Sequence, residues 1–178
     1  MVMPQICDPD TTLLLYYSQT GRTRAVSENL AHFSHLFQTV PLKKIGWHSD
    51  FCARTLGYLD LRSHRDWRLY PIAEDVSAYS TLVLLCPVWY RQPCPAITSF
   101  LHQYDVEGKV IHCLLTFDGE VGHADQMVKD AIRGAGGIVG STALLKLTEK
   151  TLQSIRDASL ELFLDREKGL SVRRGKER

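Results

Sequence analysis

The sequence predicts an α/β domain in which helices cover both faces of a five-stranded parallel sheet. Short apolar runs alternate with amphipathic segments along most of the chain. The runs are apolar at consecutive positions, which is typical of strands buried on both faces of a parallel sheet. The chain has 178 residues, of which 44% are hydrophobic and 23% charged, and this suits a single domain with a sizeable core. We therefore expect three layers in a doubly wound arrangement.

The elements follow one another in order along the chain. Strands are expected at Leu13–Tyr17, Gln38–Ile45, Thr81–Cys86, Val110–Thr116 and Ile138–Leu147. Helices are expected at Thr23–Phe37, Asp50–Ser63, Ala96–Tyr104, Ala124–Ala135 and Thr148–Asp165. Pro87 is expected to end the third strand, because proline has no N–H to donate to a sheet. The segment from Gly46 to Leu69 is the least regular and is expected to elaborate the second crossover.

One domain is expected to span residues 1–166, followed by a charged, mobile tail from Glu167 to Arg178. Met1–Asp10 lacks a basic region followed by an apolar stretch, so we expect no signal peptide. The longest apolar run, Leu82–Tyr90, is much shorter than the about 20 residues that a membrane span needs. The formal net charge of +1 gives no argument for binding nucleic acid or an anionic membrane. We therefore expect a cytoplasmic protein without nucleic-acid or membrane partners.

The five cysteines predict a reduced protein with neither a disulfide framework nor a metal site. Their number is odd, and no two are spaced as Cys-x-x-Cys. Cys86 and Cys113 lie inside apolar runs and are expected to be small core residues. Cys94 follows the third strand closely. We expect an inert thiol there, with a redox role as the alternative.

The segment from Ser18 to Thr23 carries the clearest chemical signal. It reads Ser-Gln-Thr-Gly-Arg-Thr, follows the first strand directly and opens the first helix. In a tight turn the hydroxyls at positions 18, 20 and 23 converge, and Gly21 permits backbone conformations closed to other residues. The N–H groups and positive dipole end of the helix then form an anion site. The motif is neither a Walker loop nor Gly-x-Gly-x-x-Gly. It predicts a site for a phosphate monoester, the alternative being a well-capped helix.

This segment resembles the phosphate loop of flavodoxins, usually written Ser/Thr-x-Thr-Gly-x-Thr. Pro87–Tyr90 is similar to the family's loop after the third strand, where an aromatic residue covers the isoalloxazine ring. Thr116–Gly122 occupies the place of the loop after the fourth strand. The resemblance covers the chain from about Thr12 to Asp165. It implies the flavodoxin-like strand order 2-1-3-4-5 and non-covalently bound flavin mononucleotide (FMN) beyond the carboxyl ends of the strands.

The resemblance also implies which residues hold the cofactor. Those around the phosphate are Ser18, Gln19, Thr20, Gly21, Arg22 and Thr23. Those around the ring are Pro87, Val88, Trp89, Tyr90, Arg91, Thr116, Phe117, Asp118, Gly119 and Gly122. Trp89 and Tyr90 offer flat surfaces for stacking, the alternative being ordinary packing against the next helix. Arg91 is expected near the pyrimidine edge of the flavin or in solvent.

Three further side chains lie in or next to the loop from Thr116 to Gly122. Asp118 and Glu120 are unusual beside a flavin, because negative charge disfavours the anionic reduced ring, so we expect both to point to water. His123 is a candidate for donating a proton near the ring, the alternative being that it caps the following helix.

The resemblance implies electron transfer through a bound flavin. Shuttle flavodoxins are usually strongly acidic and this chain is not, so an FMN-dependent NAD(P)H oxidoreductase acting on a quinone-like acceptor is favoured over a shuttle. Trp47, Phe51 and Trp67 would line its pocket or form a dimer surface. A flavodoxin-fold binding module without flavin is a further alternative. A phosphate-ester hydrolase is disfavoured, because Gln92 stands where a Cys86-x5-Arg loop would need arginine.

Overall fold

The computed structural model describes residues 12–34, 38–42 and 66–154. The strands are β1 (Thr12–Tyr16), β2 (Gln38–Pro41), β3 (Thr81–Trp89), β4 (Gln92–Pro93), β5 (Val110–Phe117) and β6 (Ile138–Lys146). The helices are α1 (Arg22–Ser34), the 3-10 helix η2 (Val76–Ala78), α3 (Pro95–Gln103), α4 (Ala124–Gly134) and a helical segment at residues 149–154. Five strands form a parallel sheet in the order β2-β1-β3-β5-β6, and β4 pairs antiparallel with the end of β3.

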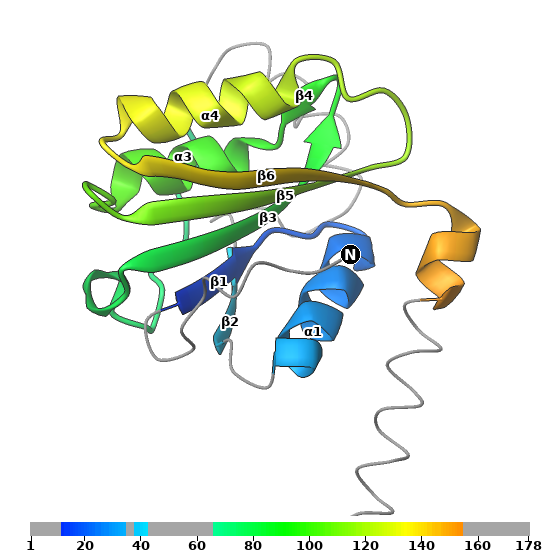
Figure 1. Ribbon diagram of the computed structural model, residues 1–178, viewed down its shortest axis with the longest axis horizontal. Coiled ribbons are helices and arrows are strands. Elements are labelled where there is room, and N and C mark those ends of the chain that lie inside the picture. The colour runs from blue at the N-terminus through cyan, green and yellow to red at the C-terminus, as the bar shows by residue number, and fades with distance from the viewer. Residues whose placement is uncertain (1–11, 35–37, 43–65, 155–178) are drawn as a thin grey trace, which may run out of the picture.

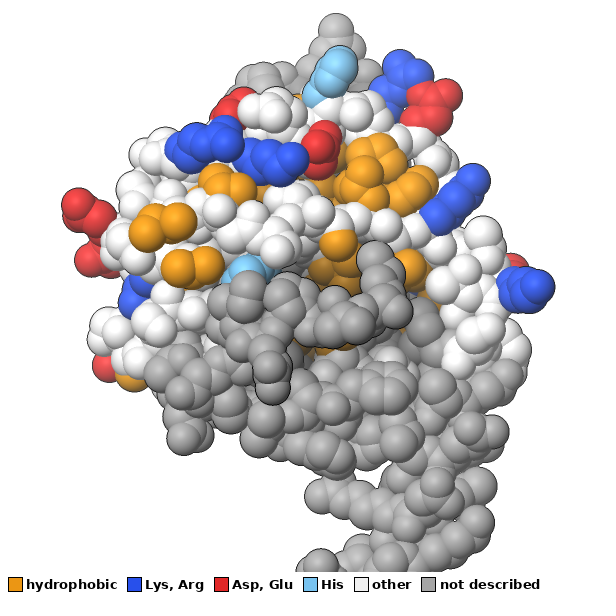
Figure 2. Space-filling model, in the orientation of Figure 1, with side chains coloured by type: hydrophobic (Ala, Val, Ile, Leu, Met, Phe, Trp, Pro, Cys, Tyr) orange, Lys and Arg blue, Asp and Glu red, His pale blue; other side chains and the backbone are white. Residues whose placement is uncertain are grey.

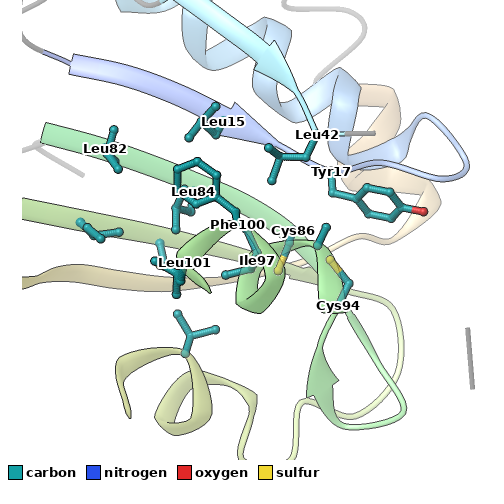
Figure 3. Packing of buried hydrophobic residues seen from close by; sticks show 14 of the residues in the cluster. Leu15, Tyr17, Leu42, Leu82, Leu84, Cys86, Cys94, Ile97, Phe100 and Leu101 are labelled. Atoms are coloured by element: carbon teal, nitrogen blue, oxygen red, sulfur yellow. The ribbon is translucent and has the colours of Figure 1, made fainter. Parts of the chain in front are cut away.

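Helices lie on both faces of this sheet (Figure 1). Helix α1 lies on one face, and α3 and α4 lie on the other. Each face has its own buried apolar cluster. On the α3 side, Phe100 and Ile97 pack over Leu84 of β3 (Figure 3). On the α1 side, Val26 belongs to the same cluster as Leu85 of β3. The predicted doubly wound, three-layer sheet is therefore confirmed.

Successive residues of β3 explain why its sequence is apolar throughout. Leu82 and Leu84 belong to the cluster on the α3 side, whereas Leu85 belongs to the cluster on the α1 side. All three side chains are at most 1% exposed. Since side chains along a strand point alternately to opposite faces, a strand with helices on both sides buries nearly every residue.

β3 is longer than the sequence predicts, because it continues through Pro87 to Trp89. Pro87 lacks an N–H, but its carbonyl accepts a hydrogen bond from the Cys94 N–H at 3.1 Å. Its partner on β5 is Thr116, so the parallel register with β5 still includes the proline, and the next two residues pair with β4. Only one donor is missing from the ladder. The prediction that Pro87 ends the strand is therefore wrong, because β3 runs on to Trp89 and pairs there with the short strand β4.

Most other elements match their predicted bounds. β1, β5, β6, α3 and α4 each begin and end within one residue of the expected positions. Helix α1 begins at Arg22, and β2 ends at Pro41 rather than Ile45. The last helix begins after Thr148, whose Oγ1 accepts a hydrogen bond from the Thr151 N–H at 3.1 Å. The rest of that helix, the helix expected at Asp50–Ser63 and the charged tail lie outside the described residues.

The edge strand β6 contains a bulge opposite His112. The register between β5 and β6 shifts there, so that His112 faces two residues of β6, Gly140 and Ser141. His112 Nδ1 accepts a hydrogen bond from the Ser141 N–H at 2.9 Å. The ring lies so close to Gly140 that a Cβ there would come within 2.8 Å of it. Because Nδ1 accepts, the ring is neutral, and burial lowers the pKa of His112.

Candidate functional site

Three loops meet at the carboxyl edge of the sheet. They are the β1 loop (residues 18–23), the β3 turn (residues 89–92) and the β5 loop (residues 116–123). The strands that precede them are neighbours in the order β1-β3-β5 and run parallel, so their carboxyl ends lie side by side. The strand order reverses between β1 and β3, and sheets of this kind bind ligands at the carboxyl ends of the strands at such a point.

The β1 loop presents the open end of α1. The first hydrogen bond of the helix runs from the Ala25 N–H to the Gly21 carbonyl at 3.0 Å, so the N–H groups before Ala25 have no acceptor within the helix. Gly21 has a φ of +82°, and no atom lies within 4 Å of the position its Cβ would take. The Ser18 hydroxyl is buried and has no hydrogen-bond partner in the described part of the chain. Thr20 is exposed. Open amides next to an unpaired hydroxyl suit an oxygen-rich anion.

Thr23 is held beneath this loop. Its Oγ1 lies 2.8 Å from Oγ1 of Thr116, and the two residues are 2% and 1% exposed. Thr116 Oγ1 also lies 3.5 Å from the Cys86 carbonyl oxygen. Of the three hydroxyls expected to converge at the β1 loop, that of Thr23 is thus engaged with the end of β5. The structure brings these two predicted site residues into direct contact.

Arg22 also joins the β1 loop to the β5 loop. Its Nη1 donates to Asp118 Oδ2 at 3.3 Å, and its Nη2 donates to Glu149 Oε1 at 3.1 Å. The Arg22 side chain is 40% exposed. Asp118 is exposed to solvent as expected, but its charge is paired with an arginine, which the sequence did not reveal. Gly119 follows in an exposed part of the loop, and Phe117 is partly buried at the end of β5.

The β3 turn has an unusual backbone. Tyr90 and Arg91 have φ values of +49° and +66°, a left-handed pair that two-residue hairpins usually fill with asparagine or glycine. Arg91 Nε donates to Glu120 Oε2 at 2.6 Å, and its Nη2 contacts the same oxygen. Gly122 has a φ of +59°, and a Cβ there would lie 2.5 Å from Cβ of Arg91. The turn therefore lies directly against the β5 loop.

A hollow of about 460 Å³ opens between this turn and the start of α4. It is lined by Tyr90, Arg91, Gln92, Glu120, Gly122, His123 and Met127. Tyr90 is 62% exposed. His123 occupies the N-cap position of α4, but its side chain makes no capping hydrogen bond. Figure 2 shows positive, negative and apolar side chains interspersed on the face that it presents.

Trp89 faces the protein more than the solvent. It is partly buried, and its ring lies 5.6 Å from that of Tyr17 and 5.9 Å from that of Trp67. Trp67 is 1% exposed, and its backbone N–H donates to Ser99 Oγ at 2.7 Å. The expectation that Trp67 lines a pocket or a dimer surface is therefore wrong, because it is a core residue. Trp47 and Phe51 lie outside the described residues. Tyr90, rather than Trp89, is the more exposed aromatic side chain of the turn.

The cysteines near the site are buried. Cys86 and Cys94 lie close together (Figure 3) and are both 0% exposed, and Cys113 is 4% exposed. Burial raises the pKa of the Cys94 thiol well above its ordinary value, and it raises that of Cys113 as well. The expected core role of Cys86 and Cys113 is confirmed. A protonated thiol at Cys94 agrees with the expectation of an inert cysteine.

Some residues of this region were not singled out from the sequence. Met127 lies one helical turn after His123, a spacing that could have suggested a shared face. Glu149 follows the last strand and gave no signal of its contact with Arg22. Among the described residues, no group of three or more His, Cys, Asp and Glu side chains could hold a metal ion. No helix within the same ranges is long and apolar enough to cross a bilayer.

Comparison with known proteins identifies similar structures. No family model matches the chain, and no curated protein matches it. A putative flavoprotein from Bacteroides eggerthii is 18% identical, with 83% of this chain and 96% of that chain covered and a TM-score of 0.65. One from Bacteroides uniformis is 18% identical, with 81% and 96% covered and a TM-score of 0.63.

A flavoprotein from Lactobacillus acidophilus, solved in complex with FMN, is also 18% identical. It covers 76% of this chain and 93% of its own length, with a TM-score of 0.66. These similarities extend over nearly the whole length of each matched structure, and the strand order found here, 2-1-3-4-5 when the hairpin strand β4 is set aside, is that of flavodoxins. The chain therefore has the flavodoxin-like fold.

Proposed function

We propose that the protein binds FMN non-covalently at the carboxyl edge of the sheet and transfers electrons through it. The observation that carries the proposal is the β1 loop. It combines the open N-terminus of α1, the left-handed Gly21 and the buried, unpaired Ser18 hydroxyl. The Lactobacillus flavoprotein, which shares the fold, is in complex with FMN and supports the choice of ligand.

The residues around the edge fit the two ends of FMN. Ser18, Thr20 and the N–H groups that open α1 would hold the phosphate. Tyr90 and the backbone of the β5 loop would contact the ring, which supplies the redox chemistry when bound. Carboxylates near a flavin disfavour its anionic reduced form. Here Asp118 and Glu120 are each paired with an arginine, which offsets their charge.

The electron partner that we favour is a small quinone-like acceptor, with NAD(P)H as donor. The hollow beside Tyr90 and Met127 supports this, because it gives a planar molecule a place next to the β3 turn. The charge of the chain also supports it, since a net charge of +1 provides little steering toward a charged protein partner. A flavodoxin-type shuttle is the second candidate, and a flavin-less binding module is the third.

The test is retention of flavin by the purified protein. FMN is added, the excess is removed by gel filtration, and the visible absorption spectrum is recorded. We expect resolved, shifted flavin bands. Thr20→Val should weaken FMN binding by about tenfold or more, which corresponds to the loss of a hydrogen bond to a charged group. Gly21→Val should weaken it too, because valine rarely adopts the φ of +82° that this turn requires. Thr142→Val is the matched control, because this buried hydroxyl lies on β6 and has no partner in the described part of the chain.

The outcomes separate the three candidates. A folded protein that retains no flavin would be a flavin-less module. Retained flavin with unchanged affinity in both β1-loop variants would place the phosphate elsewhere. Once flavin is retained, oxidation of NADH or NADPH with a quinone supports the reductase, and failure to turn over either nucleotide favours the shuttle.

A further inference from the structure

We propose that the hollow beside the β3 turn selects its acceptor by charge, taking neutral planar molecules and disfavouring anionic ones. Glu120 is then the specificity-determining residue, because it neutralises Arg91, which lines the same hollow. The acceptor class that follows is an uncharged quinone rather than one that carries a carboxylate, sulfonate or phosphate. This inference rests on the proposed function, since it concerns the acceptor of the same site.

The lining of the hollow combines apolar surface with one pair of opposite charges. Tyr90, which is 62% exposed, and Met127 offer a planar molecule a flat and an adaptable contact surface. The charged side chains among the described lining residues are those of Arg91 and Glu120. His123 lines the hollow as well, but a histidine is largely uncharged at about pH 8. At that pH the arginine and the glutamate together decide which charge an acceptor meets.

The backbone around Arg91 and Glu120 brings the two charges together. Arg91 follows Tyr90 in the left-handed turn, and a Cβ at Gly122 would lie 2.5 Å from its Cβ. Glu120 comes two residues before Gly122, so its carboxylate is within reach of the guanidinium. Arg91 Nε donates to Glu120 Oε2 at 2.6 Å, and Nη2 contacts the same oxygen. The positive and the negative charge therefore offset each other at the wall of the hollow.

An ion pair in this place affects the choice of ligand more than the stability of the fold. The two side chains are 66% and 70% exposed, and pairs as exposed as this contribute little to stability. An anionic acceptor would have to displace Glu120 from Arg91 or remain beside its negative charge, whereas a neutral acceptor meets no net charge. Bringing like charges together is a general way to reject the wrong ligand. The ion pair therefore acts against anions.

Reduction of a neutral quinone also suits a wall without net charge. The quinone takes up two electrons and two protons and becomes a hydroquinone, while the reduced flavin, which supplies them, returns to its oxidised form. Neither the quinone nor the hydroquinone is charged, so acceptor and product both meet the wall without repulsion. An anionic acceptor would meet the charge of Glu120 before and after the reaction.

Equilibrium dialysis measures this preference without any turnover. The probes are anthraquinone-2-sulfonate, which is anionic, and 2-hydroxymethylanthraquinone, which has the same rings and no charge. Their dissociation constants are measured for the oxidised, FMN-loaded protein at about pH 8 and low ionic strength, at which screening is weak. The unmodified protein should bind the neutral probe more tightly. In Glu120→Gln, the ratio of the anionic to the neutral dissociation constant should fall by at least about fivefold, the factor that a unit charge exerts at about 4 Å even in water.

Two further variants and a control show whether the ion pair itself is responsible. Arg91→Gln leaves Glu120 without its arginine and should raise the ratio. The double variant removes both charges and should return the ratio to about that of the unmodified protein. Asp130→Asn is the matched control and should leave the ratio unchanged. It alters the net charge by the same amount as Glu120→Gln, but Asp130 is paired with Arg133 on α4 and is not among the residues that line the hollow.

The outcomes distinguish this inference from the proposed function. A folded protein that retains no FMN would overturn the proposed function, and dialysis of the flavin-free protein would then test the charge selection separately. Tighter binding of the anionic probe by the unmodified protein would overturn the inference, as would binding of neither probe. An unchanged ratio in Glu120→Gln would also overturn it. An equal fall in Asp130→Asn would do the same, because it would assign the effect to the overall charge of the protein.

Discussion

Replacing Gly122 with alanine should push the β5 loop away from the β3 turn. A Cβ at this position would lie 2.5 Å from Arg91 Cβ and 2.9 Å from the Arg91 carbonyl oxygen, and the backbone has a φ of +59°. A left-handed conformation costs a residue with a Cβ about 1–2 kcal/mol. Relieving a contact this close costs about a further 1 kcal/mol or more as the two loops separate. We expect the free energy of unfolding to fall by about 2–3 kcal/mol.

Alanine variants of three other glycines allow the backbone cost and the contact cost of Gly122→Ala to be measured separately. Gly108 has a φ of +69° and no atom within 4 Å of its Cβ position, so Gly108→Ala should show the backbone cost alone. Gly140 is not left-handed, but its Cβ would lie 2.8 Å from the His112 ring, so Gly140→Ala should show a contact cost alone. Gly119 has neither feature, and its alanine variant should change stability by less than about 0.5 kcal/mol.

Urea unfolding followed by tryptophan fluorescence measures these costs, because Trp67 and Trp89 lie in one aromatic cluster that unfolding disperses. FMN affinity is measured on the same proteins. Gly122→Ala should cost more stability than Gly108→Ala and should also weaken FMN binding, which Gly108→Ala should not. Equal stability costs, with unchanged FMN affinity in both variants, would refute the contact between the loops.

Three further predictions concern the core and the edge of the sheet. Burial lowers the pKa of His112 in the folded protein, so the neutral ring contributes its full stabilisation above about pH 6.5, the ordinary pKa of an unfolded histidine, and that contribution is lost as the pH falls toward the lower folded pKa. The free energy of unfolding, measured with urea between pH 7 and pH 5, should therefore fall less steeply in His112→Phe than in the unmodified protein. Equal slopes would contradict this role of His112. No more than two of the five cysteines should react with a thiol reagent before unfolding, since three are buried; a third fast thiol would argue against that burial. Ser99→Ala should lower the free energy of unfolding by about 1–3 kcal/mol, because the buried Trp67 N–H loses its acceptor; a loss below about 0.5 kcal/mol would show that this hydrogen bond is dispensable.

The sheet could be predicted well because its strands carry an unmistakable pattern. Residues such as Leu82 and Leu84 alternate with Val83 and Leu85 between the two clusters, so both faces require apolar side chains. The end of β3 was harder to predict. Proline is expected to end a strand because it has no N–H to donate. Pro87 nevertheless stays in β3, where its carbonyl accepts a hydrogen bond from the Cys94 N–H.

The site could be predicted as a set of loops but not as a set of contacts. The order of strand, glycine turn and helix places Ser18 and Gly21 at the start of α1, which is a local property of the sequence. The contact between Thr23 and Thr116 joins residues 93 positions apart, and no spacing rule relates them. The left-handed backbone of Tyr90 could not be predicted either, because residues with side chains of this size rarely adopt that conformation.

The bulge opposite His112 has a consequence for self-association. Among the described residues, β6 is at one edge of the sheet and pairs only with β5, so within that part of the chain its other side is an open strand edge. Ile138 and Leu144 of β6 are 53% and 47% exposed, and an edge strand with exposed apolar side chains favours edge-to-edge aggregation. The bulge lies between these two residues and interrupts the straight run that a foreign strand would need. The hydrogen bond from the Ser141 N–H to His112 Nδ1 holds this bulge in place and therefore also works against pairing with a foreign strand.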